Sequence, residues 1–184
     1  KKKLNNDQLE NLVLDIRNGK ISGVNVTVPF KKSILPYIDV LSDEASKTQS
    51  VNTVYLNKNK IVGHNTDING FTMSVENIKF NIKGKKILIL GAGGVVSSII
   101  YALIKMKASN IIITNRTKSK AENLKGLFKE ITLVDWGEMP EIDMIINATS
   151  LGLKNEDKIE LEFSKIGKNK FFYDLIYNPE ETFF

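Results

Sequence analysis

The 184-residue chain contains no cysteine, a single histidine and only two arginines. Without cysteine it can form neither a disulfide framework nor a thiolate metal site, and we predict no bound metal. Its longest apolar runs, such as Ile111–Ile113 and residues 99–104, are far shorter than the roughly 20 residues that a membrane-spanning helix needs. The lysine-rich beginning leads into Asn5, Asn6 and Asp7, so no secretory signal is evident. We therefore expect a soluble, cytoplasmic protein.

Positive charge is in modest excess, with 26 lysines and arginines against 21 acidic residues and a net charge of +5. The lysines are scattered among acidic residues, apart from Lys1–Lys3 and a few pairs such as Lys85-Lys86. Because arginine supplies the bidentate contacts to bases and phosphates, its scarcity argues against a nucleic-acid partner. We expect a small-molecule partner, no membrane and no nucleic acid, and either a monomer or a homodimer.

Residues 1–78 are predicted to form an α/β domain. Helical spacing of apolar residues, alternation in short apolar segments and capping residues indicate its elements. These are a helix over 6–17, a strand over 24–28 that Pro29 ends, a helix that begins at Ser42, a hairpin of strands 51–56 and 61–65 around a turn at 57–59, and a helix that Asp67 caps. This domain contains too few elements to fold independently, so we expect it to be incomplete at its N-terminus.

Residues 79–184 show a different pattern, in which short apolar strands alternate with helical or polar stretches. The strands are expected at 87–90, 111–114, 131–134, 144–148 and 171–175. Such alternation indicates βαβ units and a parallel sheet that is buried on both faces. We place the domain boundary near residues 77–83 and expect the C-terminal end of this second domain to be missing.

A glycine-rich segment, Gly91-Ala92-Gly93-Gly94, follows the first of these strands and opens a helix. Gly91 permits a tight turn, Gly93 lets the backbone approach a pyrophosphate, and the helix N-terminus offers free N–H groups. The context predicts a Rossmann-type dinucleotide-binding domain, although a simple strand–helix turn is the alternative. Val96 occupies the third glycine position of the fingerprint, which predicts looser packing of helix against strand.

The end of the next strand discriminates between cofactors. An NAD enzyme places an acidic residue there, on the ribose 2′-hydroxyl. This chain has Asn115-Arg116-Thr117, with Lys120 one turn further on. A guanidinium and a hydroxyl suit a 2′-phosphate, which favours NADP over NAD. The alternative is that Arg116 is an ordinary exposed loop residue.

Three residues of the first domain are candidates for chemistry. Lys31 would lie in the first turn of a helix, where the dipole disfavours a cation, so a purely structural lysine gains nothing there. Asn52 and Asp67 would lie at opposite ends of the hairpin, although singly they could be a turn residue and an N-cap. His64 is the alternative acid, but alternation places it on the strand face opposite Asn65, whose parity Asp67 shares.

Together, these segments resemble the shikimate dehydrogenase family. Gly23–Lys31 (GVNVTVPFK) is similar to its lysine motif, and Gly63–Gly70 (GHNTDING) to its Asn-Thr-Asp motif. The other similar segments, in the family's order, are Val51–Thr53, Gly91–Gly94, Asn115–Thr117 with Lys120-Ala121, Asn147–Gly152 and Asp174–Pro179. The two named motifs are highly specific, whereas many enzymes share the glycine loop.

The resemblance implies NADPH-dependent reduction of 3-dehydroshikimate to shikimate, in the biosynthesis of chorismate and the aromatic amino acids. Lys31 would be the catalytic acid/base and Asp67 its partner. Both would hold the substrate together with Thr27, Asn52 and Tyr177. Cofactor contacts would come from Asp43, Gly91, Ala92, Gly93, Gly94, Val95, Asn115, Arg116, Thr117, Lys120, Asn147, Ala148, Thr149 and Leu175.

The chain departs from the family at two places. The family's early Ser-x-Ser segment, which grips the substrate carboxylate, and its late glutamine-bearing helix are both absent from this sequence. Two alternatives stay open: a quinate or shikimate dehydrogenase that prefers NAD, and a non-catalytic NADP-binding protein. The residues at 115–117 argue against the first, and the joint presence of Lys31 and Asp67 argues against the second.

Overall fold

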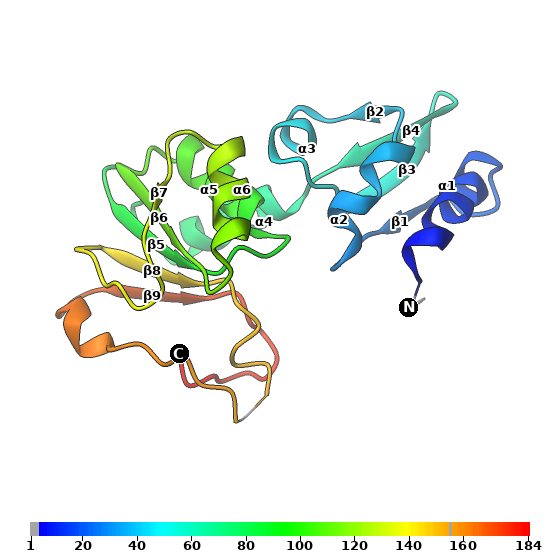
Figure 1. Ribbon diagram of the computed structural model, residues 1–184. Helices are drawn as coiled ribbons and strands as arrows, with labels where there is room; N and C mark the ends of the chain where they lie inside the picture. The colour runs from blue at the N-terminus through cyan, green and yellow to red at the C-terminus, as the bar shows by residue number, and fades with distance from the viewer. Residues whose placement is uncertain (1–3, 155) are drawn as a thin grey trace.

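The computed structural model describes residues 4–154 and 156–184, which form two lobes, each built on its own sheet (Figure 1). The N-terminal lobe, blue to cyan in Figure 1, contains four strands, and the second lobe contains five. The expected α/β class is confirmed, with a parallel sheet in the second lobe.

The first lobe contains elements in the predicted order, together with two short ones, at 35–37 and 40–41, that were not predicted. Its elements are η1 (Asn6–Gln8), α1 (Leu9–Arg17), β1 (Gly23–Asn25), α2 (Phe30–Ser33), η2 (Leu35–Tyr37), β2 (Val40–Leu41), α3 (Asp43–Thr48), β3 (Thr53–Asn57) and β4 (Lys60–His64). The sheet order is β1-β3-β4-β2, with β2 parallel to β4 and the other pairs antiparallel. α1 packs its apolar side, through Leu9, Val13 and Ile16, into a core with Val54 and Ile61.

Local signals placed most of these elements within a few residues. Ser42 caps α3 as expected, because its hydroxyl accepts a hydrogen bond from the Ala45 amide at 3.2 Å. The hairpin turn is narrower than the expected one: Lys58 and Asn59 alone connect the strands, both at positive φ, as the twist of a two-residue hairpin requires. The strand predicted over 24–28 ends at Asn25.

The second lobe carries the alternating pattern. Its elements are α4 (Asp67–Asn77), β5 (Lys86–Leu90), α5 (Val96–Lys105), β6 (Asn110–Thr114), α6 (Lys118–Leu127), β7 (Thr132–Leu133), β8 (Met144–Asn147), η3 (Phe163–Ile166) and β9 (Phe171–Asp174). All five strands are parallel in the order β7-β6-β5-β8-β9. β5, the strand before the glycine-rich segment, is the central one.

Side chains of β5 alternate between two cores. Ile87 and Ile89 join the core that α4 and α5 cover, whereas Leu88 and Leu90 join the core on the opposite face. Val96, at the third glycine position, is fully buried in the first of these cores. The sheet is therefore buried on both faces, which explains the unbroken apolar runs of its strands.

α4 packs with the second lobe although it precedes the expected boundary. Its buried residues Ile68, Phe71 and Val75 belong to the core of the parallel sheet, and not to the core that α1 forms with the first sheet. The domain boundary predicted after residue 78 thus falls at the end of α4, a helix that packs against the parallel sheet.

A carboxylate joins separate elements in the first lobe. Arg17 Nη2 donates to both oxygens of Asp39 at 2.9 Å, and the Ile61 amide donates to Asp39 at 2.6 Å. The Arg17 guanidinium, and after it the Ile61 amide, hold the pKa of the Asp39 carboxyl below its usual value. Such a carboxylate stabilises the fold above its unfolded-state pKa, and this contribution is lost as the pH falls through the lower folded-state pKa.

Asp39→Asn should therefore make the fold less acid-sensitive. We expect the urea midpoint of the wild type to fall as the pH is lowered from about 5 to 3, through the range in which carboxylates protonate, and that of the variant to fall less. Asp15→Asn is the control, because Asp15 pairs only with Lys20, at 3.0 Å, among the described residues. Identical pH dependence of the wild type and Asp39→Asn would contradict this role.

Candidate active site

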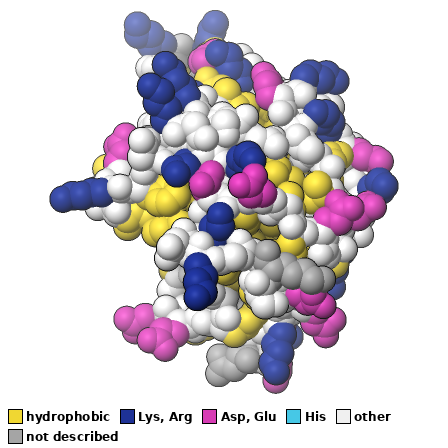
Figure 2. Space-filling model, turned by 90° about the vertical axis from the view of Figure 1, so that its left-hand side faces the viewer, with side chains coloured by type: hydrophobic (Ala, Val, Ile, Leu, Met, Phe, Trp, Pro, Cys, Tyr) yellow, Lys and Arg dark blue, Asp and Glu magenta, His cyan; other side chains and the backbone are white. Residues whose placement is uncertain are grey.

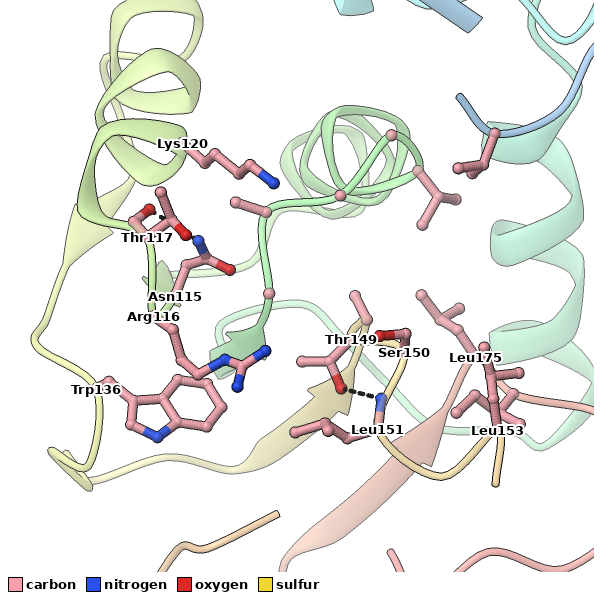
Figure 3. A pocket seen from close by; sticks show the side chains of 18 of the residues that line it. Asn115, Arg116, Thr117, Lys120, Trp136, Thr149, Ser150, Leu151, Leu153 and Leu175 are labelled. Carbon is pink, nitrogen blue, oxygen red and sulfur yellow. Dashed lines mark hydrogen bonds between the residues drawn. The ribbon is translucent and has the colours of Figure 1, made fainter. Parts of the chain in front are cut away.

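A pocket of about 790 Å³ lies at the carboxyl ends of β5, β6, β8 and β9 (Figure 3). In Figure 3, Asn115, Arg116, Thr117 and Lys120 lie on one side of it, and Thr149, Ser150, Leu151 and Leu175 on the other. The sequence-predicted cofactor residues that line it are Gly91, Ala92, Gly93, Gly94, Val95, Asn115, Arg116, Thr117, Lys120, Ala148, Thr149 and Leu175. Strand pairing thus brings together segments that lie far apart in the sequence.

Gly91 is the tightest point of the glycine loop. Its φ is +108°, and a Cβ there would lie 2.8 Å from the Ala148 carbonyl oxygen of the neighbouring strand end. Its amide donates to the Thr114 carbonyl at 2.8 Å, which ties the loop to β6. Gly94 has a φ outside the left-handed range and open space where its Cβ would be. The first glycine is therefore required by the fold itself, whereas Gly94 leaves room for a ligand to approach.

The cations of the pocket are available for an anion. Arg116 and Lys120 both line it, and no carboxylate among the described residues forms an ion pair with either. The Asn115 side chain donates to the Thr117 carbonyl at 2.8 Å and so shapes the turn that carries Arg116. The residues fit a phosphorylated dinucleotide, because the glycine loop approaches without side chains and two unpaired cations stand at the end of the neighbouring strand.

Asn147 supports the side of the pocket that Thr149 lines. It is fully buried and does not line the pocket, but its side-chain oxygen accepts from the Thr149 amide at 3.1 Å and from the Thr149 hydroxyl at 2.7 Å. Its amide group donates to the Leu151 carbonyl and to Asp174, each at 3.1 Å. Asn147 would therefore act on a bound ligand through Thr149.

Lys31, Asp67 and Asn52 form one hydrogen-bonded group. Lys31 Nζ lies 2.6 Å from Asp67 Oδ2, and Asn52 Nδ2 donates to Asp67 Oδ1 at 2.9 Å. The two ionic side chains are only 11% and 21% exposed, so water screens their attraction weakly. The Val51 amide donates to the Lys31 carbonyl at 2.9 Å, which holds α2 against the segment that carries Asn52.

Two expectations about this group were wrong in detail. α2 is a single turn of four residues, Phe30–Ser33, so it has too little length to supply the helix dipole that we invoked for Lys31. The residue that caps α4 is Thr66, and Asp67 is the first helical residue. What holds the lysine is its direct contact with Asp67, a pairing that the sequence motif indicated and the dipole argument did not.

The remaining predicted residues are distributed around these two groups. Tyr177, expected at the substrate, is highly exposed and lines the same pocket as the glycine loop. Thr27 is exposed next to Val28, which also lines the pocket. Asp43 lies outside the pocket, where Lys47 contacts it at 2.8 Å and the Tyr101 hydroxyl at 3.5 Å. His64 takes no part in the Lys31 group, and within the described chain its buried Nδ1 has no hydrogen-bond partner.

Sequence reasoning missed several residues of the pocket, above all Trp136, the only tryptophan. It lies in the segment after β7 and lines the pocket on the side of Arg116 (Figure 3). No periodic signal could have placed it, since it belongs to a loop. The other unpredicted lining residues are Val28, Ser150, Leu151, Leu153, Ile176 and Asn178.

Figure 2 shows basic side chains interspersed with acidic ones on the face that it draws. Among the residues described, no group of three acidic or histidine side chains is arranged to hold a metal ion. No helix among the described residues is long and apolar enough to cross a membrane.

The lining of this pocket fits a dinucleotide, and Val28, one of its residues, precedes the paired Lys31 by three positions in the chain. These features are typical of a dehydrogenase that uses a nicotinamide dinucleotide. Residues 1–54 match the family model of the shikimate dehydrogenase substrate binding domain, and residues 74–177 match that of shikimate / quinate 5-dehydrogenase. The chain belongs to the shikimate dehydrogenase family.

Individual relatives agree. A shikimate dehydrogenase (NADP(+)) of Pelagibacter ubique is 57% identical over 98% of this chain and 68% of its own length. The shikimate dehydrogenase structure from Aquifex aeolicus has a TM-score of 0.85 at 38% identity, covering 95% of this chain and 66% of that one. The Thermus thermophilus enzyme, solved with NADP(H) and shikimate, has a TM-score of 0.83 at 29% identity, with coverages of 94% and 65%. The chain spans about two thirds of the length of these relatives.

The crowding at Gly91 generates a prediction about stability. Gly91→Ala should lower the melting temperature by several degrees, because the new Cβ meets the Ala148 carbonyl at 2.8 Å and an L-residue is strained at this φ. Gly94→Ala is the matched control, with no heavy atom within 4 Å of its Cβ. Scanning calorimetry of both variants measures the difference, and equal melting temperatures would refute the assigned role of Gly91.

Proposed function

We propose that this chain catalyses the reversible, NADPH-dependent reduction of 3-dehydroshikimate to shikimate in aromatic amino-acid biosynthesis. The observation that carries the proposal is the contact of Lys31 Nζ with Asp67 Oδ2 at 2.6 Å, together with a pocket that fits a dinucleotide and is lined by Val28, three residues before Lys31. Family membership and the names of the relatives support it.

The chemistry divides between cofactor and protein. NADPH supplies the hydride when it is bound. Lys31 Nζ donates a proton to the alkoxide oxygen that forms on the substrate carbon, because its ammonium carries N–H donors and no acceptor. Asp67 holds that ammonium through Oδ2, while Asn52 engages Oδ1 and so fixes the rotation of the carboxylate. Thr27 and Tyr177 complete the substrate contacts in this proposal.

Cofactor preference follows from charge. Arg116 and Lys120 bind the 2′-phosphate, with Asn115 and Thr117 beside them, and an acidic residue that would favour NAD is absent from 115–117. The Gly91–Val95 segment receives the pyrophosphate, and Ala148, Thr149 and Leu175 face the nicotinamide half, with Asn147 behind Thr149. Asp43 stays a predicted contact on sequence grounds alone.

The proposal assigns residues 1–78 to substrate binding and residues 79–184 to the cofactor, with a small molecule as partner.

The two competing functions make different demands. A quinate or shikimate dehydrogenase that prefers NAD would have no use for an unpaired Arg116 in the pocket. A non-catalytic NADP-binding protein would have no use for the partly buried Lys31–Asp67 pair.

Arg116→Ala tests the cofactor assignment. It should weaken NADP⁺ binding by about tenfold to a hundredfold and leave NAD⁺ binding nearly unchanged, because only NADP⁺ carries the phosphate that accepts these charge-assisted hydrogen bonds. Fluorescence of Trp136, which lines the pocket, reports binding of both. Lys118→Ala removes a nearby charge that pairs with Asp135 at 3.5 Å and should change neither affinity. Equal loss for both nucleotides, or no loss, would overturn the assignment.

Lys31→Ala tests the proton-transfer role. It should lower kcat for shikimate oxidation by roughly 10²–10⁴-fold, as expected for loss of a general acid/base, with little change in NADP⁺ affinity. Asp67→Asn should reduce kcat and also raise KM, and the double variant should lose less than the two separate effects combined. Steady-state kinetics measures these, with Lys32→Ala, an exposed neighbour, as the control. Near-normal kcat for Lys31→Ala would return the role to Asp67 or His64.

A further inference from the structure

Asn65 lies where the chain passes from the first sheet to α4, and both its amide group and its side-chain oxygen form hydrogen bonds. It is 1% exposed. Its Nδ2 donates to Thr48 Oγ1 at 3.1 Å and to Ser98 Oγ at 2.9 Å, and its Oδ1 accepts from the Asp67 amide at 3.1 Å. Two donors and one acceptor are therefore matched with three partners in a buried place.

These partners belong to three different elements. Thr48 is the last residue of α3, Ser98 lies in α5, and Asp67 begins α4. The Thr48 hydroxyl donates a hydrogen bond to the Glu44 carbonyl at 2.7 Å, so its oxygen is oriented to accept one from Asn65. Thr48 and Ser98 are themselves 0% exposed, so water cannot replace the amide as their partner.

The bonds connect the two halves of the proposed reaction centre. α5 is the helix that follows the glycine loop, so Ser98 moves with the backbone that approaches the cofactor. Asp67, at the other end of the Asn65 side chain, holds Lys31 Nζ at 2.6 Å. Only an amide offers two N–H donors and an acceptor in this shape: aspartate lacks the donors and leucine lacks all three.

We propose that Asn65 is a positioning residue that fixes the Lys31–Asp67 pair relative to the cofactor helix α5. The proposal rests on the proposed dehydrogenase function. Hydride and proton must arrive at neighbouring atoms of one substrate, and a displacement of about 1 Å can cost about a hundredfold in rate. Loosening either Asn65 donor bond should therefore reduce turnover without removing any group that touches substrate or cofactor.

The chain provides matched variants for this test. Ser98→Ala removes one acceptor, whereas Ser97→Ala removes a hydroxyl from the adjacent residue, 1% exposed, whose Oγ has no partner in the described structure. Thr48→Val removes the other acceptor while keeping the shape, and Thr48→Ser keeps the acceptor while losing the methyl group. We expect kcat to fall about tenfold in Ser98→Ala and Thr48→Val, and to stay within about twofold in Ser97→Ala and Thr48→Ser.

Two further measurements separate positioning from stability. The affinity for NADP⁺, followed by Trp136 fluorescence, should stay within about twofold in all four variants. Amide hydrogen exchange of the segment that contains Asp67 should be faster in Ser98→Ala than in Ser97→Ala, because Asn65 Oδ1 then holds the Asp67 amide less firmly. A lower melting temperature with unchanged kcat would make Asn65 a structural residue only and overturn the proposal. A fall in kcat without faster exchange would also overturn it.

The exchange measurement needs no turnover. If the wild type fails to oxidise shikimate with NADP⁺, the proposed function fails, and the comparison of Ser98→Ala with Ser97→Ala still decides whether Asn65 holds Asp67. If the wild type is active and the two serine variants are indistinguishable in both kcat and exchange, the Asn65 proposal alone fails.

Discussion

The hydrogen bonds that pair β5 in parallel with β6 and β8 set the geometry of the pocket. Parallel pairing places the ends of all these strands at one edge, so the loops after Leu90, Thr114 and Asn147 must meet there. The register leaves little space: a Cβ on Gly91 would lie 2.8 Å from the Ala148 carbonyl. Apolar side chains of the strands pack on both faces of the sheet. This packing supports the carboxyl edge, where the glycine loop and Arg116 line the same pocket.

The proposed reaction centre is formed by residues of both lobes. Lys31 comes from the first lobe, whereas Asp67 begins a helix whose buried residues belong to the core of the second. Asn52 and Asn65 bind different groups of Asp67, the first its carboxylate and the second its backbone amide. Asp67 is thus fixed both in place and in rotation, while the lysine reaches it from the neighbouring lobe.

Much of this arrangement could be predicted from the sequence, and the failures have physical causes. Isoleucine-rich runs such as 111–113 predicted buried parallel strands because few other structures bury every residue of a short segment. The capping prediction succeeded for Ser42 but failed for Asp67, where Thr66 takes the capping position. The Lys31 contact was anticipated from a motif, but the helix-dipole argument for it failed because α2 has only four residues.

Other features lay beyond any local pattern. Trp136 reaches the pocket from a loop whose path no periodicity describes. The two acceptors of the Asn65 amide group, Thr48 and Ser98, are 17 and 33 residues away in the sequence, and only the packing of α3 and α5 against the segment that carries Asn65 brings them together. Asn147 was assigned to the cofactor itself, whereas its buried side chain supports Thr149. The sequence motifs thus predicted much of the pocket lining, whereas the contacts of Asn147 and Asn65 depend on packing that no motif describes.

The placement of α4 has a mechanical consequence. Asp67 begins a helix whose buried residues belong to the core of the parallel sheet, yet its carboxylate is held by Lys31 and Asn52 of the first lobe. The ion pair therefore also joins the two lobes, so a substitution at Lys31 or Asp67 acts on the connection between the cores as well as on the proposed acid.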